Sequence, residues 1–86
     1  MSIGEIKAIL HEADRSLSDA ATTVKEIGTQ LDEATGLALA SLHDSQHTEA
    51  NEARADLISA RREVELTLRV ITAVKDNAAS YRESLG

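Results

Sequence analysis

The stretch Leu42-His43-Asp44-Ser45-Gln46-His47-Thr48 lies near the middle of the sequence, and two long helical patterns stop on either side of it. Asp, Ser and Thr side chains compete for backbone hydrogen bonds, so such residues favour turns and helix caps over helix interiors. The sequence therefore predicts two helices joined by a turn at this stretch.

The pattern before the turn is that of one long amphipathic helix. Ser2 followed by Glu5 matches a capping box, and we expect a helix over residues 2–42, about 60 Å long at 1.5 Å per residue. A rod of this length cannot bury its apolar side against itself. Its apolar residues recur at alternating intervals of three and four positions: Ile3, Ile6, Leu10, Ala13, Leu17, Ala20, Val24, Ile27, Leu31, Ala34 and Ala38.

Two glycines, Gly28 and Gly36, fall inside this predicted helix. Each costs up to about 1 kcal/mol relative to alanine in a helix interior, and we interpret both as tolerated. Two alternatives remain open. Gly36 could end the helix and leave Leu37–Leu42 as a separate turn, or Gly28, next to Ile27, could let a partner backbone approach closely.

The pattern after the turn predicts a second helix over residues 46–85. Asp44, Ser45 and Thr48 are candidate N-caps for it. Its seam has the same three-four spacing, with one polar member: Ala50, Ala53, Leu57, Ala60, Val64, Thr67, Ile71, Val74, Ala78, Tyr81 and Leu85.

The two patterns match each other in an antiparallel hairpin. Placing Ala38 opposite Ala53 also places Ile27 opposite Val64 and repeatedly sets large residues against small ones, as close packing prefers. A pairing that is one heptad shorter matches as well. The predicted hairpin seam consists of Ile6, Leu10, Leu17, Val24, Ile27, Leu31, Leu57, Val64, Ile71, Val74 and Tyr81.

The second helix has more apolar residues than one seam requires. We interpret Ile58, Leu66, Leu68 and Val70 as a second interface that binds a partner, against the alternative that they are scattered surface residues. A strand over residues 64–70 fits their alternation but disagrees with the helical spacing on both sides. We therefore predict an all-α fold with a single domain over residues 1–86, an antiparallel two-helix hairpin that dimerises into a four-helix bundle.

The composition excludes several classes of function. With a net charge of −6, the chain would be repelled by nucleic acid and by anionic membranes. The charged residues among the first twenty argue against a signal peptide or a membrane span. His43 and His47 have a spacing suited to a metal, but only Asp44 and Glu49 are near them, so we interpret both as solvated turn residues. We expect no catalytic, metal or cofactor site, and no enzyme activity.

The layout resembles the early-secreted-antigen-like (Trp-x-Gly) helical-hairpin family: 86 residues, no cysteine and two equal amphipathic helices about a central turn. At the turn, Leu42-His43-Asp44-Ser45 stands where that family has Trp-x-Gly. Near the end of the chain, Tyr81 is followed by Glu83 and Leu85, whereas the family's export signal has an acidic residue four positions after the tyrosine. The resemblance implies homo- or heterodimeric four-helix bundles that are substrates or partners of type VII secretion.

Two functions therefore remain open. One is a secretion-associated substrate or accessory partner of this type. The other is a cytoplasmic, self-associating coiled-coil adaptor or regulator, of the antitoxin-like or phage-encoded kind. In both cases the expected partner is a second copy or another helical protein, with no nucleic acid and no membrane insertion. The expected location is the cytoplasm, or the exterior by a route that needs no signal peptide.

Overall fold

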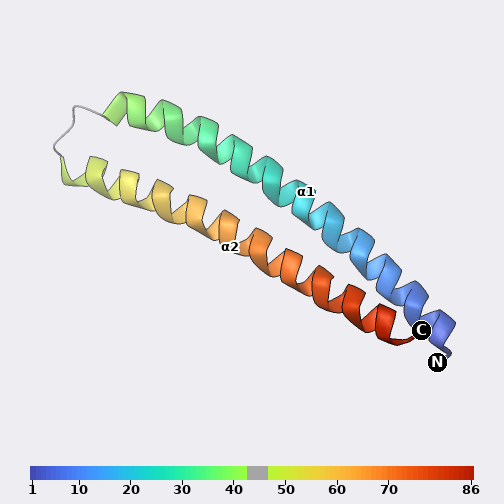
Figure 1. Cartoon of the computed structure of the whole chain (residues 1–86). Coiled ribbons are helices and arrows are strands. Elements are labelled where there is room, and N and C mark those ends of the chain that lie inside the picture. Colours follow the sequence, from blue (N-terminus) through green and yellow to red (C-terminus); the bar gives the residue numbers. More distant parts are fainter. Residues whose placement is uncertain (43–46) are drawn as a thin grey trace.

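A computed structural model of the chain, which describes residues 1–42 and 47–86, shows two long helices side by side (Figure 1). α1 spans Ile3–Leu42 and α2 spans Thr48–Ser84. They run antiparallel in a gently bowed rod of 63 × 16 × 15 Å, with both chain termini at one end. The described residues contain no strand. The predicted all-helical hairpin is therefore confirmed, and the strand alternative over residues 64–70 is excluded.

The helix starts are set by different groups. At α1, the Glu5 N–H donates to Ser2 Oγ at 3.1 Å, as the capping pattern predicts. α2 begins later than predicted, because His47 has extended backbone angles and its carbonyl accepts from the N–H groups of Ala50 and Asn51. The N-cap is therefore His47. Of the three predicted caps, Thr48 is already inside the helix, and Asp44 and Ser45 lie outside the described residues.

The contact between the helices leaves most of its residues partly exposed. Among the described residues only Ala50, at 6% exposure, is fully buried. The large apolar residues of the predicted seam that turn toward the other helix are only partly buried: Ile6, Leu10, Leu17, Val24, Leu31, Leu57, Val64 and Ile71. The hairpin therefore has a contact line along its length and no closed core of its own.

Three predicted seam residues lie outside this line. Ile27, Val74 and Tyr81 are 50%, 46% and 51% exposed, whereas the next residue in each case, Gly28, Lys75 or Arg82, is partly buried. Leu17, Val24 and Leu31, seven positions apart, stay on the line along α1, so the second row of the contact lies on the other flank of these residues from the one that the apolar spacing predicts. The contact line moves to the following residue even where that residue is small or charged.

The pairing of the helices agrees with the longer of the two predicted registers. A Cβ atom built on Gly28 would lie 3.1 Å from Val64 Cγ1, one residue from the predicted pairing of Ile27 with Val64. Lys75 Nζ donates to Ser18 Oγ at 2.7 Å, again one position from the predicted pairing of Leu17 with Val74. The register that is one heptad shorter is therefore wrong.

The structure also decides between the interpretations of the two glycines. What approaches closely at Gly28 is a side chain of α2 in the same chain, since a Cβ atom built on Gly28 would lie 3.1 Å from Val64 Cγ1. α1 continues through Gly36 without a break, and nothing lies within 4 Å of a Cβ built there. Gly36 is therefore a tolerated helix residue and not a cap.

Leu17 provides a test of the contact line. Leu17→Asp is expected to lower the free energy of unfolding by about 2 kcal/mol or more, because it places a charge among apolar side chains. Thr22→Asp, at an exposed position one turn away, is the matched control and is expected to stay within about 0.5 kcal/mol of the wild type. Thermal unfolding at one protein concentration measures both, and equal melting temperatures would contradict the assigned contact.

Substitution by alanine is expected to have different effects on stability at the two glycines. Gly36→Ala is expected to stabilise the protein by up to about 1 kcal/mol, since the added methyl meets open space and the helix gains propensity. Gly28→Ala gains the same propensity, but its methyl would press on Val64 at 3.1 Å, so its net gain is expected to be smaller or negative. Urea denaturation of the two variants measures the difference, and an equal gain would show that the helices do not approach closely at Gly28.

Candidate interaction surface

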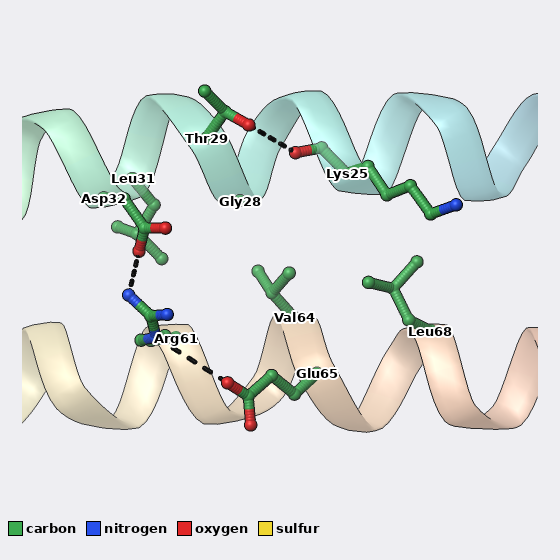
Figure 2. Close-up of a pocket in the computed structure, with 9 residues that line it drawn as sticks. All are labelled: Lys25, Gly28, Thr29, Leu31, Asp32, Arg61, Val64, Glu65 and Leu68. Atoms are coloured by element: carbon green, nitrogen blue, oxygen red, sulfur yellow. Dashed lines mark hydrogen bonds and ion pairs between the residues drawn. The ribbon is translucent and has the colours of Figure 1, made fainter.

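One broad side of the hairpin carries a groove between the helices. Its volume is about 280 Å³, and Val64 and Leu68 point from α2 toward α1 across it (Figure 2). Asp32 and Arg61 form an ion pair that bridges the two helices, and Arg61 Nε lies 3.6 Å from Glu65 Oε1 on its own helix. The lining residues are Lys25, Gly28, Thr29, Leu31, Asp32, Arg61, Val64, Glu65 and Leu68.

A second polar cluster lies on the same side, nearer the chain termini. Lys75 Nζ donates to Ser18 Oγ at 2.7 Å and lies 4.0 Å from Asp14 Oδ1, with both charged side chains about two-thirds buried. Near the other end, Arg54 Nη2 donates to the Leu42 carbonyl at 3.1 Å and so satisfies one of the last carbonyls of α1. Arg61, Asp32, Lys75 and Arg54 on this side are thus used for contacts within the hairpin.

The opposite broad side is apolar along α1 and along the second half of α2, whereas Asp56 and Glu63 lie in the row of Val70 nearer the start of α2. On α1, the groove-lining residues Lys25, Thr29 and Asp32 each come one position after a residue of the contact line. Residues that come one position before the contact line therefore lie on the opposite flank of α1 and face away from the groove. The same holds for α2, where Arg61 and Glu65 mark the groove flank. Both remaining flanks therefore share one side of the rod. We call this surface the apolar face and define it by Ile9, Ala13, Ala20, Ile27, Ala34 and Leu37 of α1 and Leu66, Val70, Val74 and Tyr81 of α2.

The apolar face differs from an ordinary solvated surface. On α1, the row of positions spaced three and four apart from Ile6 to Ser41 along this flank contains no charged residue, although 28% of the chain is charged. Every large apolar residue that defines the face is exposed. A contiguous exposed apolar surface bordered by polar residues is typical of a site that binds another protein.

The residues predicted for a partner interface divide between two sides. Leu66 and Val70 lie on the apolar face. Leu68 is partly buried and lines the groove, so it belongs to the contact between α1 and α2. Ile58 is 60% exposed on the groove side of α2. Ile58 comes three residues before Arg61, and residues three apart lie on the same flank of a helix.

Ile27, Val74 and Tyr81 are the members of the apolar face that sequence reasoning assigned elsewhere. They were placed in the hairpin seam because they have its spacing and are more apolar than their neighbours. The signal that identifies them is a second three-four row, one position before the contact line on both helices. The contact line is covered by the other helix of the hairpin, whereas this second row stays exposed to solvent.

The described residues include no metal site. His11 and His47 are both exposed, and no group of three or more His, Cys, Asp or Glu residues in the described ranges is placed to hold a metal ion. His43 and Asp44 lie outside those ranges. In the same ranges, neither helix contains a stretch that is long and apolar enough to cross a membrane.

The Lys75 cluster is expected to select the register of the hairpin, since another register would leave this charge without Ser18 and Asp14. Replacing a paired, partly buried charge by an apolar residue changes stability little or raises it. Lys75→Met is therefore expected to keep the melting temperature but to give more than one set of amide resonances in NMR spectra. Lys25→Met, at an exposed position, is the control, and a single set of resonances from Lys75→Met would contradict the assignment.

Nothing among protein-family models, curated protein sequences or solved structures matches this chain.

Proposed function

We propose that this protein is a non-enzymatic interaction module, a helical hairpin that buries its apolar face against a second helical hairpin to form a four-helix bundle. The observation that carries the proposal is the contrast between the two sides of the contact line. Only Ala50 is fully buried among the described residues, while Ile27, Val70, Val74 and Tyr81 are exposed together on one face.

The energetics of a small chain support association. Apolar burial at about 25 cal/mol per Å² roughly cancels a loss of about 1.5 kcal/mol of conformational entropy per ordered residue in proteins of this size. The sequence has no cysteine to form a disulfide. A second hairpin laid on the apolar face would supply the missing burial, with helices crossing at about 20° as in other four-helix bundles.

For the biological role, we propose a secretion-associated substrate or accessory partner of the type VII kind. The support is the layout alone: two helices of 40 and 37 residues in a hairpin, as in the early-secreted-antigen-like family. The alternative is a cytoplasmic adaptor or regulator that self-associates. It is favoured by Leu42-His43-Asp44-Ser45 in place of Trp-x-Gly and by Leu85 in place of an acidic residue.

The host cell distinguishes these two roles. A secretion partner is expected in the culture medium, with recovery that depends on an intact secretion ATPase. An adaptor is expected to stay in the cells whether or not the ATPase is present. Growth of the native host with and without a functional ATPase, followed by detection of this protein in both fractions, measures the difference.

Val70 and Ile58 provide a matched test of the interface, because they are 61% and 60% exposed on opposite sides of α2. Val70→Glu is expected to weaken the oligomer at least about tenfold, as about 1.4 kcal/mol of lost apolar contact would. Ile58→Glu is expected to leave it unchanged. Sedimentation equilibrium measures both. A wild-type protein of monomer mass at micromolar concentration, with a melting temperature independent of concentration, would contradict the proposal.

A further inference from the structure

We propose that the hairpin which covers the apolar face belongs to a different protein, in which lysine and arginine residues border the apolar stripe. The inference rests on the proposed function and specifies the chemistry of the partner. The distribution of charge around this hairpin carries it, because acidic residues border the apolar face and basic residues are absent from it.

Acidic residues border the apolar face along the outer edge of α1. They recur at every seventh position, and each lies three or four positions from members of the uncharged row on this flank: Glu5, Glu12, Asp19, Glu26 and Glu33. All five are exposed. Within the described part of the chain, only the carboxylate of Glu12 has an ion-pair partner, with Arg15 Nη1 at 3.3 Å from its Oε1.

The first half of α2 adds acidic residues to the face itself. Asp56 and Glu63 lie in the row of Val70, at intervals of seven positions, and Glu49 and Glu52 continue this flank toward the start of the helix. All four acidic residues are exposed. A partner laid along the whole face must cover these carboxylates, and covering a carboxylate is costly unless a positive charge comes with the partner.

None of the nine lysine and arginine residues of the chain lies on the apolar face. Lys75 and Arg82 are on the contact line. Arg15 and Arg62 are on the groove flank, since they lie three positions before Ser18 and seven before Arg69. The other five come one position after a residue of the contact line, which also places them on the groove flank: Lys7, Lys25, Arg54, Arg61 and Arg69. The charges on the apolar face and its borders are therefore of one sign.

A second copy of this chain fits such a surface poorly, because both symmetric pairings bring acidic residues together. When the copies point in opposite directions, α1 lies against α1, and two acidic edges flank one contact. When they point in the same direction, α1 lies against α2 of the other copy. Since Gly28 lies level with Val64, Glu63 of one copy then falls between the levels of Glu26 and Glu33 of the other. Like charges therefore weaken self-association in either pairing.

A hairpin with basic edges meets both requirements of the surface. The apolar residues need cover, since Ile27, Val70 and Tyr81 are each at least half exposed. The carboxylates beside them need positive partners once water is excluded. Lysine and arginine side chains can lay their apolar stems along the border of the stripe while their charged ends reach a carboxylate. The partner is thus an amphipathic helical hairpin with basic residues on both edges of its apolar stripe.

The salt dependence of self-association gives the first measurement. Raising the ionic strength from about 0.01 M to about 0.5 M screens the repulsion between the acidic edges, so the dissociation constant of the wild-type dimer is expected to fall at least about threefold. Sedimentation equilibrium at several salt concentrations measures it. A dissociation constant that stays level or rises with salt would overturn the inference, because the edges of two copies would then not repel.

A variant of this chain serves as the basic-edged partner in the second measurement. Glu26→Lys with Glu63→Lys places a positive charge beside the apolar face on each helix. At low ionic strength, its mixture with the wild type is expected to form a complex with a dissociation constant at least about fivefold below that of the wild-type dimer, and salt is expected to reduce this difference. Asp76→Lys with Glu83→Lys, on the groove flank of α2, makes the same change in net charge and is the control, with little gain expected.

The outcomes separate this inference from the proposed function. A tighter complex with the Glu26→Lys, Glu63→Lys variant than with the control supports a basic-edged partner. Equal dissociation constants for the two mixtures, with a dimer mass, overturn the inference and leave the four-helix bundle standing. A wild type that stays a folded monomer, alone and with the variant, overturns both.

Discussion

The contact between α1 and α2 runs along one line for the length of the rod, and each helix can cover only one flank of the other. Large residues on the line, such as Leu17 and Val64, therefore remain partly exposed. In larger domains a third element closes the other side of such a contact. In the described part of this chain there is no third element, so the stability of the fold and the character of its surface have the same cause. The apolar face is the flank that the hairpin cannot close.

Polar groups fix how the two helices align, although they contribute little burial. The Lys75 and Ser18 pair, the Asp32 and Arg61 pair and the contact from Arg54 to the Leu42 carbonyl are spread along the rod. Each contact joins one helix to the other, and a shift of one heptad would separate all of them. Gly28 acts in the same direction, because close approach is possible only where Val64 meets a residue without a side chain. Apolar spacing alone permitted two registers, and these specific contacts distinguish them.

Sequence reasoning was sufficient for the hairpin, for the helix bounds to within a few residues and for the pairing to within one residue. The three-four spacing is long and uninterrupted, and an antiparallel pairing is strongly constrained by a central turn. It was not sufficient to assign residues to flanks. Ile27 and Gly28 are about 100° apart around the helix, and hydrophobicity favours Ile27 for the seam. The structure places Gly28 there, because the distance between the helices depends on the smallest residue at the contact. Leu68 was misassigned for a related reason, since it follows Val64 by four residues on the contact line and lines the groove (Figure 2).

The two sides of the rod consequently have different roles. On the groove side, charged residues such as Arg61 and Lys75 have partners in the other helix, so a visiting protein would have to compete with existing contacts. On the other side, the large residues that define the apolar face are exposed and are not covered by the described part of the hairpin. A partner that binds the apolar face can therefore gain apolar burial without displacing any contact that holds α1 to α2.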